Sequence, residues 1–147
     1  MCLIIDANRG GDFANLQEPY LSPLLSWVRR GGKIVSGGKL ESELSKIGVM
    51  REMMLEWSRR GNLVRISSVS IQNEIDSLCP IKSDDPHVVA LARLSGARLV
   101  VTEDKKLISD LKDSNVVGFR RKIYKKDGSK PANIRNHRRM LAGLDCP

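Results

Sequence analysis

Short apolar segments alternate with longer amphipathic segments along most of this chain, and this alternation constrains the fold more than any other feature. Residues 2–6, 33–36, 63–66, 99–101 and 116–119 have the length and aliphatic character of buried strands. The segments between them carry apolar residues three or four positions apart, which is typical of helices that pack on one face. Strands alternating with helices favour a parallel sheet. The sequence therefore predicts a three-layer α/β/α sandwich with a mainly parallel sheet of about five strands.

The helices between these strands have recognisable ends. Helical spacing is expected at residues 21–28, 40–47, 49–60, 68–78, 85–95 and 105–112. Ser68 is predicted to cap one helix, and Asp85 followed by Pro86 is predicted to open another. Gly96 is predicted to end the latter helix. Pro131 is predicted to start a short basic helix near the end of the chain.

The composition fits one intracellular domain. The chain has 147 residues, enough for a single core, and only 4% aromatic residues, so the core must be mainly aliphatic. The low aromatic content also argues against single-strand binding by base stacking. Cys2, Cys79 and Cys146 share no short spacing, so neither a disulfide framework nor a zinc knuckle follows from them. With no basic leader and no long apolar run, a soluble cytoplasmic protein is expected.

The net charge of +8 is unevenly divided along the chain. Residues 120–147 carry nine Lys and Arg against two Asp, whereas residues 1–119 carry 16 basic against 15 acidic residues. We therefore expect a domain over residues 1–119 and a basic C-terminal extension over residues 120–147. The extension can track phosphates of a nucleic acid, or it can be a solvated surface or a docking segment for a protein. Its predicted nucleic-acid-binding residues are Arg120, Arg121, Lys122, Lys125, Lys126, Arg135, Arg138 and Arg139.

Four acidic residues are placed where a parallel sheet binds ligands, beyond the carboxyl ends of its strands. Asp6 ends the first strand, and Asp104 lies just past the fourth. Glu43 lies on the helix after the second strand, about 65° from the centre of that helix's apolar stripe at about 100° per residue. Asp85 begins the helix that leads into the fourth strand. Carboxylates without nearby His or Cys favour Mg²⁺ or Mn²⁺ over zinc, and such a site can activate water against a phosphodiester.

In order and context, these residues resemble the PIN-domain nuclease family. The resemblance rests on LIIDAN at residues 3–8, SEL at 42–44, SDDPHVVALARLSGARLVVTED at 83–104 and the KLISDL segment that follows. It covers roughly residues 1–119. It implies an α/β/α sandwich whose metal-binding and catalytic residues are Asp6, Glu43, Asp85 and Asp104. It further implies that Asn8 and Thr102 lie beside these acids and position them without binding the metal themselves.

The same resemblance implies a function and partners. It implies a Mg²⁺- or Mn²⁺-dependent endoribonuclease that cuts single-stranded or structured RNA, either as the toxin of a toxin–antitoxin pair or as an RNA-processing enzyme. An inhibitory antitoxin protein and a second copy of the chain are the protein partners it suggests. The chain departs from the family pattern at Arg9, Gly10, Gly11 and Asp12, where apolar residues are usual, and at Leu107, where a further acid is common.

Each acid also has a structural explanation when taken alone. Asp85 can simply cap its helix, Asp104 can favour a helix start through the dipole, and Glu43 can be a solvated helix residue. The alternative function is a catalytically inactive module of the same fold that binds nucleic acid or regulates another protein. A phosphoacceptor receiver domain requires an Asp at the end of the third strand, where Ser67 stands.

Other chemistries lack their motifs. The residues before Gly38 and Lys39 do not form a phosphate-binding loop, and Ser36 has no nearby base in the sequence. His87 and His137 are too few and too far apart for a histidine metal site, and both are expected to be solvated.

Overall fold

Five strands form a single sheet in which every neighbouring pair is parallel. The computed structural model describes residues 3–126 and 131–144. The sheet has the order β3-β2-β1-β4-β5, so β1 and β4 occupy its centre. This arrangement confirms the predicted α/β class and the parallel sheet. The strands are β1 (Leu3–Ile5), β2 (Ile34–Gly37), β3 (Leu63–Ile66), β4 (Leu99–Val101) and β5 (Lys122–Tyr124).

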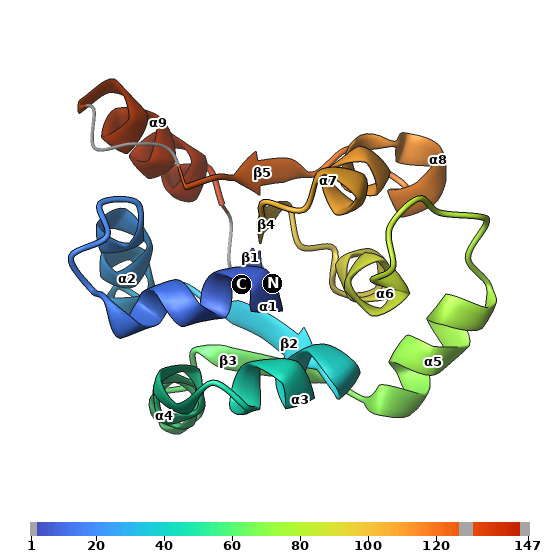
Figure 1. The fold of residues 1–147 in the computed structure, drawn as a ribbon, viewed down its shortest axis with the longest axis horizontal. Helices are drawn as coiled ribbons and strands as arrows, with labels where there is room; N and C mark the ends of the chain where they lie inside the picture. The colour runs from blue at the N-terminus through green and yellow to red at the C-terminus, as the bar shows by residue number, and fades with distance from the viewer. Residues whose placement is uncertain (1–2, 127–130, 145–147) are drawn as a thin grey trace.

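Helices cover both faces of the sheet, as the predicted three layers require. Figure 1 shows α2, α4 and α9 on one side and α5, α6, α7 and α8 on the other. The short α1 and the 3-10 helix η1 follow β1, and α3 contacts both α1 and α6. The helices are α1 (Ala7–Gly10), η1 (Gly11–Ala14), α2 (Leu21–Arg29), α3 (Gly38–Ser45), α4 (Gly48–Arg59), α5 (Ser68–Asp76), α6 (Pro86–Ser95), α7 (Lys105–Lys112), α8 (Ser114–Val117) and α9 (Pro131–Ala142).

The core lies around the two central strands. Every residue of β1 and β4 is fully buried, because helices cover both faces of the strands at this position. Tyr20, Tyr124 and Phe13 are the largest fully buried side chains, and the contact of Tyr20 with Tyr124 joins the segment after β1 to the end of β5. No helix within the described residues is long and apolar enough to cross a membrane.

The last strand differs from the prediction. Residues 116–119 were expected to form it, but Ser114–Val117 is the short helix α8, whose first turn is capped by the Asp113 carboxylate accepting from the backbone N–H of Asn115 at 2.9 Å. The fifth strand is instead Lys122–Tyr124, which pairs with β4. Basic residues flank its apolar residues Ile123 and Tyr124. Because of this surrounding charge, the sequence indicated a basic tail here and not a strand. The predicted basic helix starting at Pro131 is confirmed as α9, which packs against α2.

Two helix starts show how local chemistry sets the boundaries. Ser67, not Ser68, caps α5, and its hydroxyl accepts a hydrogen bond from the backbone N–H of Ser70 at 3.2 Å. Asp85 precedes Pro86 at the start of α6, but its carboxylate makes no capping hydrogen bond. The capping explanation for Asp85 is therefore wrong. Gly96 ends α6 in the left-handed conformation, as predicted.

The turn between β2 and α3 depends on two glycines. A Cβ on Gly37 would lie 2.3 Å from the carbonyl oxygen of Ile66 on the neighbouring strand, closer than real atoms approach. Gly38 has φ +51°, a left-handed conformation that costs other residues energy. These two residues let β2 pass directly into α3, which carries Glu43 across the carboxyl edge of the sheet.

Candidate active site

The carboxyl ends of the two central strands meet at Asp6 and Thr102. The backbone N–H of Asp6 donates to the carbonyl oxygen of Val101 at 3.0 Å, which continues the pairing of β1 with β4. Beyond this bond, the fully buried Thr102 hydroxyl donates to Asp6 Oδ2 at 2.7 Å. The contact places Thr102 beside the first acid, and its predicted supporting role in the site stays a prediction.

Asp104 is joined to the same group through the backbone. Its N–H donates to Thr102 Oγ1 at 3.1 Å, so one hydroxyl bridges Asp6 and the segment that carries Asp104. The Asp104 Oδ1 atom accepts from the backbone N–H groups of Lys106 and Leu107 at 2.9 and 3.1 Å and caps α7. Because both capping bonds to described residues involve Oδ1, Oδ2 stays available to a ligand. Asp104 thus serves as both a helix cap and a candidate ligand.

Asp6 is the electrostatic centre of this edge. Asp6 is only 5% exposed, and this burial raises the pKa of its carboxyl above the ordinary value. The hydrogen bond from Thr102 lowers the pKa, whereas the charges on Asp85 and Asp104 raise it further. The three aspartates are therefore close enough for their charges to act on one another. Such repulsion is what a bound cation would relieve.

Asp85 is held in position by a buried acid on another helix. Asp110 of α7 is 2% exposed, and its two carboxylate oxygens accept from the backbone N–H groups of Lys82 and Ser83 at 2.9 and 2.8 Å. These bonds fasten the loop that leads to Asp85. The spacing within the sequence gave no sign of this role, because Asp110 contacts a segment 27 to 28 residues earlier.

Glu43 and Glu41 point to different neighbours. Glu41 Oε1 accepts from Arg65 Nε of β3 at 2.7 Å, so its carboxylate is directed toward the sheet edge away from β1. Glu43 Oε2 lies 3.5 Å from His87 Nε2 of α6, and Glu43 Oε1 lies 3.7 Å from Lys39 Nζ. Glu43 is therefore the acid of α3 that faces the helix opened by Asp85, as the predicted helix phase requires.

Both histidines are buried, contrary to the expectation that they are solvated. His87 is 4% exposed beside Glu43, and burial lowers its pKa although the charges of Glu43 and Asp85 act in the opposite direction. His137 is 1% exposed and stacks on Tyr124 with ring centroids 4.2 Å apart. Their positions within amphipathic helices are the signal that could have indicated burial. His87 thereby joins the candidate site as a neighbour of both Glu43 and Asp85.

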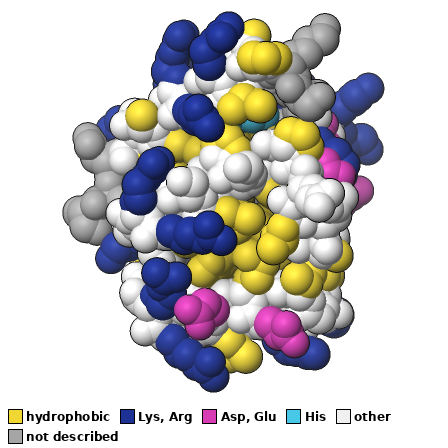
Figure 2. Space-filling model, turned by 90° about the vertical axis from the view of Figure 1, so that its left-hand side faces the viewer, with side chains coloured by type: hydrophobic (Ala, Val, Ile, Leu, Met, Phe, Trp, Pro, Cys, Tyr) yellow, Lys and Arg dark blue, Asp and Glu magenta, His cyan; other side chains and the backbone are white. Residues whose placement is uncertain are grey.

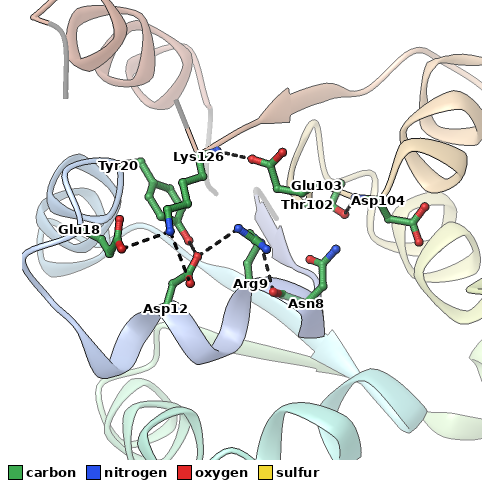
Figure 3. Close-up of polar contacts among 9 residues, drawn as sticks. All are labelled: Asn8, Arg9, Asp12, Glu18, Tyr20, Thr102, Glu103, Asp104 and Lys126. Atoms are coloured by element: carbon green, nitrogen blue, oxygen red, sulfur yellow. Dashed lines mark hydrogen bonds and ion pairs between the residues drawn. The ribbon is translucent and has the colours of Figure 1, made fainter. Parts of the chain in front are cut away.

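The segment after Asp6 is tied down by a network centred on Asp12 (Figure 3). Asp12 Oδ2 accepts from Arg9 Nη1 at 3.2 Å and from the Tyr20 hydroxyl at 2.6 Å. Lys126 Nζ lies 3.9 Å from Asp12 Oδ1 and 3.2 Å from Glu18 Oε1. Arg9 and Asp12, which depart from the family pattern, therefore fix the loop that follows the first acid.

The other predicted supporting residue, Asn8, lies in the same loop. Asn8 is exposed at the start of α1, and its backbone carbonyl oxygen accepts a hydrogen bond from Arg9 Nε at 3.1 Å. Its side-chain amide makes no hydrogen bond to another described residue, so a supporting role for Asn8 stays a prediction.

The predicted nucleic-acid-binding residues fall into two groups. Arg121 is 3% exposed, donates to the carbonyl oxygen of Ala92 at 2.9 Å and stacks against Phe119, and burial lowers its pKa to about 10. Lys126 is engaged with Asp12 and Glu18. Neither side chain is presented freely to a phosphate. The remaining residues are exposed: Arg120, Lys122, Lys125, Arg135, Arg138 and Arg139.

The donor chemistry fits a hard divalent cation, although the acids are not drawn into one compact cluster. Asp6, Asp85 and Asp104 offer only carboxylate oxygens, which Mg²⁺ and Mn²⁺ prefer. Within residues 3–126 and 131–144, no three His, Cys, Asp or Glu side chains form a group that could hold a metal ion between them. The expected convergence of all four acids into one group is therefore not found: Thr102 links Asp6 to the backbone of Asp104, and Glu43 lies beside His87. Mg²⁺ commonly uses one or two carboxylates together with waters and substrate phosphates, and this smaller requirement is met.

Comparison with known proteins adds no family assignment. No family model, no curated protein and no solved structure matches this chain.

Proposed function

We propose that this chain is a Mg²⁺- or Mn²⁺-dependent nuclease of the PIN-domain type that hydrolyses phosphodiester bonds in RNA. The observation that carries the proposal is the buried Asp6 carboxylate, whose pKa is raised by burial and by the charges of Asp85 and Asp104. Folding brings these like charges together at the edge of the sheet where ligands of parallel α/β proteins bind. The choice of RNA rests on the family resemblance of the sequence.

The acids have distinct roles in this proposal. Asp6 and Asp104 would hold the cation, with Thr102 orienting Asp6, and Asp85 would complete the site from the loop fastened by Asp110. A bound divalent cation would supply charge that activates water and neutralises the phosphate. Glu43, whose carboxylate lies beside His87, would accept a hydrogen bond from the attacking water.

The reaction balances without a further reactant. The oxygen of water forms a new bond to phosphorus, and the bond from phosphorus to the leaving ribose oxygen breaks. One proton of the water ends on the leaving oxygen, and the other stays on the new phosphate group or passes to solvent. The protein residues orient the water and the phosphate and are unchanged at the end.

The rival function is a non-catalytic nucleic-acid-binding module with the same fold. The lack of a compact three-residue ligand group in the described part of the chain favours it. A module of this kind needs no metal for binding and no particular acid for activity. A titration with Mn²⁺ separates the two functions, because only the nuclease requires the cation and the acids together.

The test is cleavage of single-stranded RNA with Mn²⁺ by the wild-type protein and by the variants Asp6→Asn and Asp104→Asn. Loss of a ligand charge should abolish metal-dependent cleavage, lowering the rate at least about 100-fold, while circular dichroism shows a folded chain. Asp76→Asn on the exposed face of α5 is the matched control and should cleave normally. Full activity in either site variant, with the same metal requirement, would disprove the catalytic assignment.

A further inference from the structure

Basic side chains line the edge of the sheet opposite the acids. The strands are parallel, so all their amino ends lie at one edge and all their carboxyl ends at the other. Arg29 and Arg30 lead into β2, Arg60 leads toward β3 and Arg98 directly precedes β4. Arg120 stands just before β5, and Lys122 is its first residue. We call these six residues, all exposed, the amino-edge cations: Arg29, Arg30, Arg60, Arg98, Arg120 and Lys122.

The register confirms that these residues share one edge. Leu99 of β4 lies opposite Lys122 of β5 and opposite Leu3 of β1, and Leu3 in turn lies opposite Ile34 of β2. One transverse row therefore crosses the sheet at the amino ends of its strands. Asp6 and Thr102 stand past the other ends of β1 and β4, so the cations and the candidate active site occupy opposite edges.

The amino-edge cations line three hollows on the surface. Arg98, Arg120 and Lys122 line one of about 300 Å³ beside Phe119 and Met140. Arg30 lines a second of about 420 Å³ together with Arg138 of α9. Arg29 and Arg60 line a third of about 320 Å³ between α2 and α4. Because α2 and α9 pack together, the hollows follow one another along this side of the molecule.

Figure 2 shows this side of the molecule, with Lys and Arg side chains in a row from top to bottom and acidic side chains beside its lower end. Glu52 and Glu56 line the third hollow. The only ion pair that an amino-edge cation forms within the described residues is that of Arg60 with Glu56, at 4.0 Å and exposed. The first two hollows are lined by no acid. Most of the positive charge along the row is therefore available to an external anion.

The dimensions and chemistry of this edge suit a chain of phosphates better than a protein. Five strands about 4.8 Å apart span about 19 Å, which is long enough to contact several successive phosphates of one strand. The core of a protein interface is depleted in charge, whereas charged side chains recur along this whole edge. Arginines without acidic partners favour phosphate contacts, which position a nucleic acid without reading its sequence.

We infer that the amino-edge cations form a binding track for the phosphates of single-stranded nucleic acid, separate from the acids that would cut it. The choice of RNA as the polymer rests on the proposed function, but binding at this edge does not. The charge count along the sequence assigned nucleic-acid binding to the C-terminal extension alone. The track extends this binding surface to residues within the first 119 positions.

The test measures binding of a labelled oligouridylate of about 15 nucleotides in EDTA, where metal-dependent cleavage cannot occur. Fluorescence anisotropy gives the dissociation constant between about 50 and 200 mM KCl. The variant Arg30→Gln/Arg98→Gln removes two charges from the track. The control Lys46→Gln/Arg51→Gln removes two exposed charges, one from the residue that follows α3 and one from the first turn of α4, both outside the three hollows.

The track variant should flatten the slope of log K against log[salt] by about 1.4, since each lost single-strand phosphate contact contributes about 0.7. The control should keep the wild-type slope, and Arg30→Lys/Arg98→Lys should restore it. Equal flattening in the track variant and the control would overturn the track in favour of net charge alone. An unchanged slope in the track variant would also overturn it and assign these charges to an acidic protein. Because no catalysis is involved, failure of the nuclease proposal would leave these slopes unaffected.

Discussion

Asp6 combines burial, a hydrogen bond and neighbouring like charges at one carboxyl group. Burial and the charges of Asp85 and Asp104 favour the protonated form, and the Thr102 hydroxyl favours the ionised form. The net effect raises the pKa above 3.8, so the folded protein holds this proton more tightly than the unfolded chain does. Ionised Asp6 therefore opposes folding in the absence of metal.

The first residue-scale prediction concerns stability and pH. Without metal, Asp6→Asn should raise the free energy of unfolding at pH 7, because it removes a charge whose burial opposes folding. The gain should shrink as the pH falls through the raised pKa of Asp6 and should vanish below 3.8, where the wild-type carboxyl is protonated in both states. Urea unfolding in EDTA at several pH values measures it. A lower stability of the variant at pH 7 would show that the Thr102 bond outweighs burial.

A second residue-scale prediction separates the two glutamates of α3. Glu43→Gln should lower the rate of Mn²⁺-dependent RNA cleavage at least about 100-fold, because it removes the acceptor that positions water. Glu41→Gln should change the rate little, since Glu41 pairs with Arg65 and loss of this partly exposed ion pair costs about 0 to 1 kcal/mol of stability. Single-turnover cleavage assays measure both variants. The reverse ranking would mean that Glu41 is the acid that acts.

At this scale the sequence indicated where the acids stand more readily than what surrounds them. Strand ends and helix phase are local properties, so the places of Asp6, Asp104 and Glu43 followed from spacing, whereas Thr102 came from the family resemblance. Asp110 and His87 owe their roles to contacts between separate elements, α7 with the loop before α6 and α6 with α3. The approach of the four acids to one another depends on loop conformation, and within the described residues they do not form one metal-binding group.

The turn from β2 to α3 is the element that positions Glu43 at the candidate site. Substitutions of two glycines in this turn and of one glycine outside it test how strongly the turn depends on them. Gly37→Ala should lower the free energy of unfolding by at least about 3 kcal/mol, because the new Cβ meets the backbone of Ile66. Gly38→Ala should cost about 1 to 2 kcal/mol, for its left-handed backbone conformation. Gly48→Ala at the start of α4, where a Cβ meets nothing within 4 Å, should be neutral or stabilising.

Thermal and urea unfolding of the three glycine variants gives their order. If Gly48→Ala proved as harmful as Gly37→Ala, the cost would reflect a general loss of backbone freedom and not the close approach of β2 to β3.

Element boundaries could be predicted wherever apolar pattern and punctuation agreed. The strands β3 and β4 and the helix α7 have the predicted bounds, and β1 and β2 lie within one residue of them. The pattern failed at residues 113–124, where the run of Val116 to Phe119 has strand-like composition but follows a capping Asp113. Pairing with β4 then turns the charged segment Lys122–Tyr124 into a strand, and no local signal reports such pairing.

Across the whole molecule, folding separates charges that are mixed along the chain. Residues 1–119 have nearly balanced charge, yet parallel topology sends the acids after the strands to one edge and the cations before the strands to the other. A charge count along the sequence cannot detect this separation, because it depends on which ends of the strands meet. In the same topology β5 is the outermost strand of the sheet, although its residues belong to the extension predicted from the sequence.

The last prediction concerns removal of residues 120–147. This deletion takes away β5 and α9, including the buried side chains of Ile123, Tyr124 and Leu141, the stacking of His137 on Tyr124 and the hydrogen bond from the Tyr124 hydroxyl to the Tyr20 carbonyl oxygen. Three buried apolar side chains contribute about 5 to 9 kcal/mol at about 1.5 to 3 kcal/mol each, comparable with the whole stability of a domain, about 5 to 15 kcal/mol.

The chain ending at Phe119 should therefore be largely unfolded at 25 °C, as seen by loss of a cooperative urea transition and of near-ultraviolet circular dichroism. A chain ending at Leu144, which keeps every described element, is the control and should unfold like the full protein. A cooperative transition at the wild-type urea concentration in the shorter chain would show that residues 1–119 form an independent domain. With the expected result, the role of the basic residues in binding must be measured by substitution, because deletion would remove the fold together with the charge.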